Sequence, residues 1–192
     1  MLAVMALERH EATGEILVTG ATGGVGSIAV SLLSSLGFSV TAATGKESEH
    51  DYLRALGATR IVDRDELTAA GKPLQSQRWG GAIDSVGGHT LANVLAQTNY
   101  GGLVASCGLA SGSDLPATVM PFILRAITLQ GINSVWCPAD LRRAAWHRLG
   151  HDLNLDALDS IVETIGLSSA IGVAERMLRG EVRGRVVVDV QH

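Results

Sequence analysis

The sequence predicts an α/β fold, with a doubly wound parallel sheet in three layers (helix, sheet, helix). Short aliphatic segments alternate along the chain with segments of helical periodicity, which is the pattern of repeated βαβ units. Of the 192 residues, 46% are hydrophobic but only 4% are aromatic, so the core must consist of Val, Ile, Leu and Ala, as in buried parallel strands. Twenty-three glycines separate these segments. Right-handed crossovers between the strands then give a doubly wound sheet.

Each expected strand is a short aliphatic run, and each expected helix has apolar residues at helical spacing. The first strand is expected at 15–19, the first helix at 25–36 and the second strand at 38–43. Gly37 and Gly57 each follow a helix, because glycine readily adopts the left-handed conformation that ends one. The remaining strands are expected at 60–63, 81–85, 103–107, 127–131 and 185–190, and the remaining helices at 49–56, 90–97, 139–151 and 169–178.

The charges and the cysteines exclude several classes of protein. The 15 basic and 19 acidic side chains give a net charge of −4 without a block of one sign, so a surface for nucleic acid is not expected. Two cysteines, Cys107 and Cys137, exclude a disulfide framework and a Cys-x-x-Cys zinc site, and the expected location is a reducing cytoplasm. No apolar run approaches the roughly 18–20 residues that span a bilayer, and the N-terminus does not resemble a signal peptide.

A glycine-rich segment, Gly20-Ala-Thr-Gly-Gly-Val-Gly26, lies between the first strand and the first helix. Glycines at such a turn let a phosphate approach the backbone N–H groups, toward which the helix also points its positive end. The spacing differs from the standard Gly-x-Gly-x-x-Gly, and a tight turn without a ligand is the alternative. The strand before the segment, the helix after it and the second strand on schedule favour dinucleotide binding. A P-loop is excluded because no Gly-Lys-Ser/Thr follows.

The end of the second strand indicates which dinucleotide binds. NAD sites usually place Asp or Glu there, about 20 residues after the loop, to bind the ribose 2′-hydroxyl. This chain has Thr44-Gly-Lys46 instead, which offers a cation, a hydroxyl and backbone donors to a 2′-phosphate. The sequence therefore favours NADP(H). The alternative is a solvated loop lysine, and Glu47 and Glu49 weaken the positive field around it.

Residues that follow the later strands are further candidates, because ligands of open α/β sheets bind outside the carboxyl ends of the strands. Each of them is also compatible with an ordinary loop. They are Arg64, Val86, Gly87, Gly108, Leu109, Asn133 and Ser134.

Other arrangements of reactive residues do not support a catalytic or metal site. His147 and His151 are four residues apart on an expected helix, but Arg148 stands where a zinc protease has Glu, and no third ligand is evident. A solvated basic helix is therefore favoured. Asp84 and Cys107, at the ends of two strands, are expected to be structural.

Several segments together resemble the zinc-independent medium-chain dehydrogenases and reductases. They are Gly20-Ala-Thr-Gly-Gly-Val-Gly26, Thr44-Gly-Lys-Glu-Ser48, Asp51-Tyr-Leu-Arg-Ala-Leu-Gly-Ala58 and Gly81-Ala-Ile-Asp-Ser-Val-Gly87. A second group is similar to the acryloyl-CoA reductase and putative quinone oxidoreductase branch of that superfamily. It comprises Leu91-Ala-Asn-Val-Leu-Ala-Gln97, Asn99-Tyr-Gly-Gly102, Cys107-Gly-Leu109 and Val119-Met-Pro-Phe-Ile-Leu-Arg125. The resemblance extends from about Met1 to Val190.

The resemblance implies a Rossmann-type oxidoreductase that uses NADPH and no metal. Its reaction would be hydride transfer to the activated C=C of an enoyl thioester (acryloyl-CoA-like), an enone or a quinone. The implied cofactor residues are Thr22, Gly23, Gly24 and Val25 for the pyrophosphate, Thr44, Gly45 and Lys46 for the 2′-phosphate, Arg64 for the adenosine end, Leu109, Ile123 and Ser134 for the nicotinamide half, and Arg185 for closing the site.

The resemblance also implies that the chain is the cofactor-binding part of an enzyme, without its N-terminal GroES-like substrate domain. Residues 1–12 would be the remnant of an inter-domain helix and 13–192 the NADP-binding domain, with 181–190 as a closing strand that would join the substrate domain. No catalytic residue is therefore assigned, and the chain alone is expected to bind NADPH with little turnover. The expected partners are a small-molecule acceptor and, through the edge of the sixth strand, a second copy of the chain, but no nucleic acid or membrane.

Two alternatives belong to other classes. A short-chain dehydrogenase can also carry Gly-Ala-Thr-Gly but requires Tyr-x-x-x-Lys, whereas Leu56 follows Tyr52 and Val104 follows Tyr100 at that spacing. A non-catalytic module that binds or senses NADPH stays open.

Overall fold

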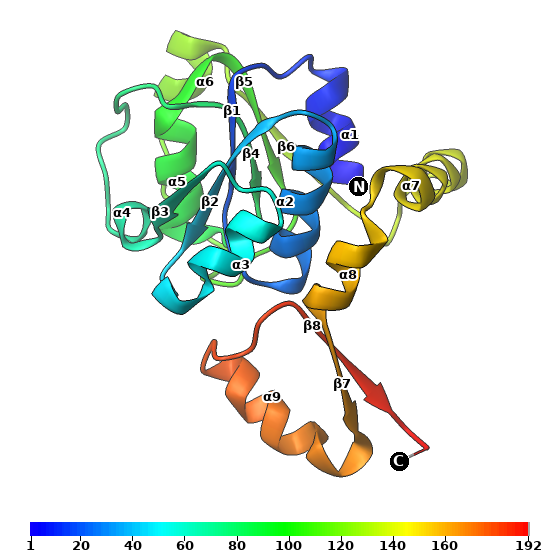
Figure 1. The fold of residues 1–192 in the computed structure, drawn as a ribbon. Coiled ribbons are helices and arrows are strands. Elements are labelled where there is room, and N and C mark those ends of the chain that lie inside the picture. The colour runs from blue at the N-terminus through cyan, green and yellow to red at the C-terminus, as the bar shows by residue number, and fades with distance from the viewer. Residues whose placement is uncertain (192) are drawn as a thin grey trace.

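The computed structural model describes residues 1–191, and its centre is a six-stranded parallel sheet (Figure 1). The strand order is β3-β2-β1-β4-β5-β6, so the chain starts in the middle of the sheet and builds each half outward in turn. The predicted doubly wound α/β fold is thereby confirmed. The six strands are β1 (Glu15–Val18), β2 (Ser39–Thr44), β3 (Arg60–Asp63), β4 (Trp79–Asp84), β5 (Thr98–Ser106) and β6 (Thr128–Gly131).

Helices cover both faces of the sheet and enclose two separate hydrophobic cores (Figure 1). Ile16 and Val18 of β1 point into one core and Leu17 into the other, because successive side chains of a strand point to opposite faces. The first core is closed by α1 (Leu2–Arg9), α2 (Gly24–Ser35) and α3 (His50–Ala55), and the second by α4 (Asp65–Thr68), α5 (Gly88–Gln97) and α6 (Met120–Arg125). Within residues 1–191, no helix has both the length and the apolar composition needed to cross a membrane.

The N-terminal helix α1 is firmly attached to the rest of the fold. Its side chains Val4 and Leu7 are fully buried in the first core. Glu8 on its outer side accepts a hydrogen bond from Arg148 of α7 (Ala139–Asp152) at 3.0 Å, and Arg148 also donates to Asp152 at 2.6 Å. The hydrogen bonds to Glu8 and Asp152 raise the pKa of the Arg148 guanidinium, so this cation stays charged and holds α7 against α1.

The C-terminal residues form a second, smaller unit and do not add a strand to the main sheet. Strand β8 (Arg185–Asp189) pairs in parallel with β7 (Val162–Gly166), and α9 (Ala170–Leu178) connects the two. Figure 1 shows this unit projecting from the main domain, with α8 (Leu155–Ile161) leading into β7. The sequence predicts the strand at 185–190 but not its partner β7.

Three helices of seven residues or fewer, α4, α6 and α8, are also absent from the sequence prediction. Segments of this length complete at most two helical turns, so their apolar residues do not establish a period, and none of them is followed as closely by a glycine as α3 is by Gly57. The other helices and all six strands of the main sheet lie within a few residues of the predicted positions.

The variant Gly26→Ala is expected to destabilise the fold, because α2 contacts the glycine loop at this residue. A Cβ at Gly26 would lie 2.2 Å from the Gly20 carbonyl oxygen and 2.7 Å from the Ala21 Cα, so the helix or the loop would have to shift. Overpacking of this kind costs about 1–3 kcal/mol, which a urea titration followed by circular dichroism measures as a lower free energy of unfolding.

The matched control is Gly150→Ala in α7, where an added Cβ meets nothing within 4 Å. This variant is expected to gain up to about 1 kcal/mol from helix propensity. Equal free energies of unfolding for the two variants would contradict the close contact of α2 with the loop.

Candidate functional site

The buried carboxylate of Asp84 connects the ends of β1 and β4, the neighbouring strands between which the strand order reverses. It accepts the Thr19 hydroxyl at 2.6 Å and the Gly87 backbone N–H at 2.9 Å. Burial raises the pKa of Asp84, and these two hydrogen bonds offset part of the rise. Asp84 has the structural role that the sequence predicts, at the crevice where doubly wound sheets bind ligands.

The glycine loop after β1 folds tightly against the start of α2. Gly20 has a φ of +58°, and the Gly23 N–H donates to its carbonyl at 2.9 Å. Gly23 is the N-cap of α2, and no side chain caps this end of the helix. The backbone N–H groups of the first turn therefore face the crevice without a side-chain acceptor, the arrangement by which helix N-termini bind phosphate.

The C-terminal unit lies against this loop. The Gly184 N–H donates to the Thr22 carbonyl at 2.8 Å, and Gly184 pairs with Gly23 in an isolated parallel bridge. The side chain of Arg185 covers Gly24, where an added Cβ would lie 2.7 Å from Nη2. The structure thus brings the candidate residues of the loop together with Arg185, which is distant in the sequence.

Two cations flank the end of β2. The Lys46 N–H donates to Thr44 Oγ1 at 3.1 Å, and the Lys46 ammonium donates to the Val182 carbonyl at 3.0 Å. The Arg64 N–H donates to the Thr44 carbonyl at 3.1 Å, and an added Cβ at Gly45 would lie 2.5 Å from Arg64 Nε. All four predicted residues of this end of the site, Thr44, Gly45, Lys46 and Arg64, therefore lie together.

Carboxylates close to these cations have only a weak effect on them. Glu49 forms an ion pair with Arg183 at 3.2 Å, so its charge is already compensated. Asp65 lies 3.8 Å from Arg64 Nε, and both side chains are well exposed. Exposed pairs of this kind contribute little energy, so a buried phosphate would compete with Asp65 for Arg64.

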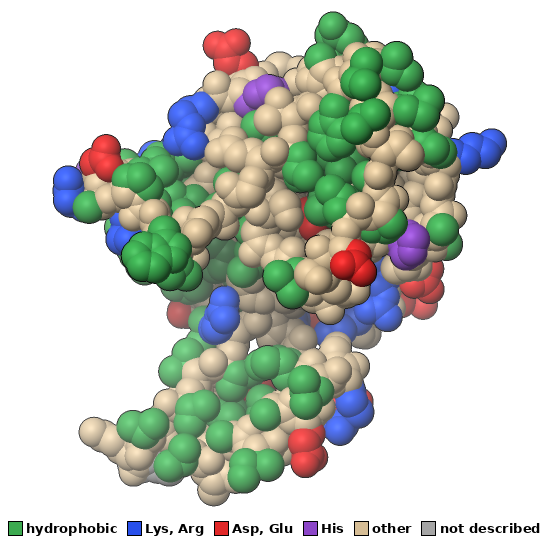
Figure 2. Space-filling model, turned by 180° about the vertical axis from the view of Figure 1, so that it is seen from behind, with side chains coloured by type: hydrophobic (Ala, Val, Ile, Leu, Met, Phe, Trp, Pro, Cys, Tyr) green, Lys and Arg blue, Asp and Glu red, His purple; other side chains and the backbone are tan. Residues whose placement is uncertain are grey.

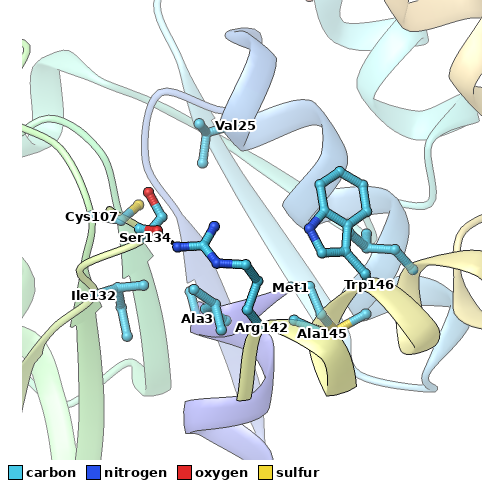
Figure 3. Close-up of a pocket in the computed structure, with 11 residues that line it drawn as sticks. Met1, Ala3, Val25, Cys107, Ile132, Ser134, Arg142, Ala145 and Trp146 are labelled. Carbon is cyan, nitrogen blue, oxygen red and sulfur yellow. Dashed lines mark hydrogen bonds between the residues drawn. The ribbon is translucent and has the colours of Figure 1, made fainter. Parts of the chain in front are cut away.

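A cavity of about 300 Å³ lies at the ends of β5 and β6 (Figure 3). Val25 of α2, Cys107 after β5 and Ser134 after β6 border it on one side, and Arg142 and Trp146 of α7 border it on the other. It adjoins the glycine loop through Val25. The crevice therefore extends from Lys46 and Arg64 at the end of β2, past the glycine loop, to this apolar cavity.

Leu109 and Ile123 do not line this cavity. Leu109 is 65% exposed and lies beside the loop after β4, where a Cβ on Gly87 would be 3.3 Å from its Cα. Ile123 is 73% exposed on α6, and two residues later Arg125 donates to the carbonyl of Thr98, the first residue of β5. Ile123 thus lies apart from the other candidates, and its assignment stays a prediction.

Arg142 and Trp146 are not predicted by the sequence as site residues. The composition of 139–151 indicates a solvated basic helix, and most of its side chains are exposed. The available signal is the spacing of four residues, which places an arginine and a tryptophan on one face of a helix.

The comparison with protein families decides the classification. A family model described as "Zinc-binding dehydrogenase" matches residues 24–149, more than half of the chain. The chain belongs to the zinc-binding dehydrogenase family. The probable acrylyl-CoA reductase AcuI of Escherichia coli (strain K12) is 52% identical over 193 residues, which cover 99% of this chain and 59% of that protein. The predicted resemblance to the medium-chain reductases of the acryloyl-CoA reductase branch is confirmed. The chain spans less than two thirds of the length of the curated relatives it matches.

Solved structures of family members agree closely with this fold. Escherichia coli K-12 YhdH with bound NADPH has a TM-score of 0.94 and 52% identity, covering 97% of this chain and 58% of that one. Bacillus subtilis YhfP with NAD bound has a TM-score of 0.91 and 45% identity, covering 98% of this chain and 59% of that one. The Rossmann-type fold is confirmed, and these two relatives carry different nicotinamide dinucleotides.

The residues that the structure describes do not fit the zinc ion of the family description. Among residues 1–191, no three His, Cys, Asp or Glu side chains are grouped closely enough to hold a metal. The rings of His147 and His151 stack on each other at 4.5 Å, and the His151 Nδ1 lies 2.8 Å from the His147 carbonyl oxygen. No step of the function proposed below therefore passes through a metal.

The variant Asp84→Asn is expected to remove one pH-dependent part of the stability. Because burial raises the pKa of Asp84 in the folded protein, this carboxyl contributes its full stabilisation below its ordinary pKa, near about pH 4. The contribution is lost as the pH rises through the raised pKa. From about pH 4 upward, the free energy of unfolding of the wild type should therefore fall relative to that of Asp84→Asn.

Urea titrations at a series of pH values between about 4 and 8 measure this difference. Asp51→Asn serves as the control for replacing a carboxylate at the surface, because the Asp51 side chain is 98% exposed. If the free energy of unfolding changes with pH in the same way for the wild type and Asp84→Asn, the pKa of Asp84 is not raised in the folded protein.

Proposed function

We propose that the chain is the NADP(H)-binding part of a reductase that acts on an activated C=C of an enoyl thioester (acryloyl-CoA-like), an enone or a quinone. The observation that carries the proposal is the pair of cations, Lys46 and Arg64, around Thr44 and Gly45. An ammonium and a guanidinium beside backbone donors suit the 2′-phosphate that distinguishes NADP from NAD. The NADPH in Escherichia coli YhdH and the name of the Escherichia coli relative support the assignment.

The cofactor would lie along the crevice, and the residues divide by the part of it they would hold. The proposed sets are Thr22, Gly23, Gly24 and Val25 for the pyrophosphate, with Arg185 closing over them, Thr44, Gly45 and Lys46 for the 2′-phosphate, Arg64 for the adenosine end, and Leu109, Ile123 and Ser134 for the nicotinamide half. The fit is supported by Gly24 and Gly45, where an added Cβ would collide with Arg185 and Arg64. Each guanidinium thus packs against bare backbone.

When bound, the reduced cofactor supplies the hydride for the β-carbon of the acceptor. The chain's own residues bind and orient: the glycine loop fixes the phosphates, and Val25 and Ser134 border the apolar cavity in which the acceptor meets the nicotinamide half. Correct placement of two reactants accounts for a large part of such catalysis. We expect the chain alone to bind NADPH with little turnover, since it positions the cofactor but does not by itself hold the whole acceptor in place.

We infer that the C-terminal unit joins a second domain, which binds the acceptor. Strands β7 and β8 form a two-stranded sheet, and a sheet of this size is at best marginally stable alone. Val187 and Val188 of β8 remain 45% and 36% exposed. The greater length of the relatives supports the inference. Residues 1–12 would then be the end of an inter-domain helix, 13–192 the NADP-binding domain and 181–190 the strand that joins the substrate domain.

The variant Lys46→Glu is expected to weaken NADPH binding by roughly 10–100-fold, because it replaces an attraction to the 2′-phosphate with a repulsion. NADH has no 2′-phosphate, so its dissociation constant should change little. The measurement is a fluorescence titration of the chain with each cofactor. Lys72→Glu, a substitution of the other lysine, lies outside the crevice and is the control.

Two outcomes would contradict this assignment. The first is wild-type binding of NADH as tight as that of NADPH, an outcome to test because Bacillus subtilis YhfP has NAD bound. Alternatively, Lys46→Glu would weaken both cofactors alike, which would place Lys46 away from the 2′-phosphate.

We also propose a homodimer that pairs along β6, with the two main sheets continuing into each other. Strand β6 is the edge strand of the sheet, so one side of its backbone has no partner strand within residues 1–191. Large exposed apolar side chains precede it on α6 and follow it, and Figure 2 shows hydrophobic side chains gathered over the region of α6. Their exposed fractions are 56% for Leu124, 76% for Val135 and 85% for Trp136. Exposed patches of this kind mark interaction sites.

The variant Val135→Asp is expected to weaken this dimer at least about tenfold, because burial of an unpaired carboxylate costs more than 1.4 kcal/mol. Sedimentation velocity over a range of concentrations measures the association constant. Leu178→Asp is the matched control, since Leu178 is 90% exposed on α9, away from β6. A wild type that sediments as a monomer throughout would refute the dimer.

A further inference from the structure

We propose, on the basis of the function proposed above, that Arg142 binds the carbonyl oxygen of the acceptor in the cavity at the ends of β5 and β6. The ligand class is an α,β-unsaturated carbonyl compound, a thioester or a ketone, whose C=C is conjugated to that oxygen. The inference assigns an acceptor-binding role to a residue of α7 that has no part in holding the cofactor.

Arg142 reaches the part of the crevice where the acceptor must lie. It lines the same cavity as Val25, which follows the phosphate loop, and Ser134, which follows β6. Figure 3 shows its guanidinium projecting from α7 into the space between Val25 and Ser134. A group bound to this guanidinium would therefore lie beside the nicotinamide half of the cofactor.

The guanidinium is fixed in orientation, and its charge is not neutralised by a carboxylate. Its Nη2 donates to the carbonyls of Ser134 at 2.6 Å and Val135 at 3.2 Å. In the part of the chain that the structure describes, no carboxylate lies within ion-pair distance of Arg142, and Nε and Nη1 make no hydrogen bond. On the same helix, Arg148 pairs with both Glu8 and Asp152. Arg142 thus keeps two donor groups for an oxygen that carries negative charge.

The remainder of the lining is largely apolar. Ile132, Trp146 and Leu149 offer apolar surface to the carbon atoms of an acceptor, while the guanidinium of Arg142 lies on the exposed side of the cavity. A volume of about 300 Å³ is at the lower end of small-molecule sites. The cavity therefore suits the reactive unsaturated end of an acceptor, while the rest of a large thioester lies outside.

The chemistry explains why a guanidinium is useful here. As the β-carbon accepts the hydride from the reduced cofactor, a C–H bond forms and the π electrons of the C=C move to give an enolate. The negative charge develops on the carbonyl oxygen, which accepts hydrogen bonds from Arg142. The hydride comes from a C–H bond of the dihydronicotinamide, which breaks. The α-carbon then takes a proton from water, a proton from the solvent neutralises the hydroxide that is left, and the carbonyl forms again. The acceptor gains two electrons and two hydrogens, the cofactor is oxidised, and Arg142 keeps its protons throughout.

The test compares two ligands that differ only in the carbonyl group. Propanoyl-CoA carries the thioester oxygen of the reduced product, whereas S-propyl-CoA, a thioether, lacks it. Calorimetric titration of the full chain, with and without saturating NADP⁺, gives both dissociation constants. Propanoyl-CoA is expected to bind about 10–100-fold more tightly, which corresponds to a hydrogen bond to a charged group. Arg142→Ala should abolish the difference, and Arg142→Lys should retain part of it.

Arg143→Ala is the matched control, because Arg143 is exposed on the same helix but does not line the cavity. It should preserve the preference for propanoyl-CoA and should bind NADPH like the wild type. Equal binding of the two ligands by the wild type, no binding of either, or an unchanged preference in Arg142→Ala overturns the proposal.

The cofactor titrations separate this inference from the function on which it rests. NADPH binding without a carbonyl preference leaves the cofactor assignment intact and removes the role of Arg142. A carbonyl preference that depends on Arg142, in a chain that does not bind NADPH, supports the acceptor site and contradicts the cofactor assignment.

Discussion

The site depends on one buried carboxylate, Asp84, which joins the ends of three strands. Its side chain binds Thr19 after β1 and the Gly87 N–H after β4, and its backbone carbonyl accepts the Cys107 N–H after β5 at 2.8 Å. Burying a carboxylate is costly unless hydrogen bonds compensate for the loss of water. The contacts of Asp84 supply part of that compensation, and they also connect the three loops to one another. The crevice between the two halves of the sheet therefore exists before any ligand binds.

Three cations, Lys46, Arg64 and Arg185, lie at this crevice although the chain as a whole carries a net charge of −4. The C-terminal unit and the segment that leads into it position several of the groups at the crevice. The Val182 carbonyl accepts a hydrogen bond from the Lys46 ammonium. Two residues further along the chain, the Gly184 N–H donates to the Thr22 carbonyl, and the side chain of Arg185 then covers Gly24. A local field of this kind attracts anionic ligands to one place on an otherwise acidic protein. The unit that projects from the main domain thus contacts the end of the crevice at which the phosphates are proposed to bind.

The sequence predicts the main sheet well because its strands depend on short-range patterns, and patterns of the same kind suggest the residues of the proposed phosphate end. Six aliphatic strands, the loop from Gly20 to Gly26 and the segment Thr44 to Lys46 are each visible within a few residues. The pairing of β7 with β8 depends instead on segments about twenty residues apart, one of which follows a helix without a break. Arg142 is not predictable for a related reason: its orientation comes from the carbonyls of Ser134 and Val135, in a loop whose path no local pattern specifies.

The two ends of the crevice differ in chemistry, and this difference fixes the direction in which a dinucleotide can lie. One end offers backbone N–H groups with Lys46, Arg64 and Arg185, which suit phosphates. The other end is an apolar cavity with a single guanidinium, that of Arg142. A reduced nicotinamide ring is uncharged, so it would not neutralise the guanidinium if it lay in the cavity. A phosphate in the cavity would instead lose its contacts with the backbone N–H groups of the glycine loop. In the proposed function the ring would then lie beside an unpaired cation, which would polarise a neighbouring carbonyl at the point where the hydride arrives.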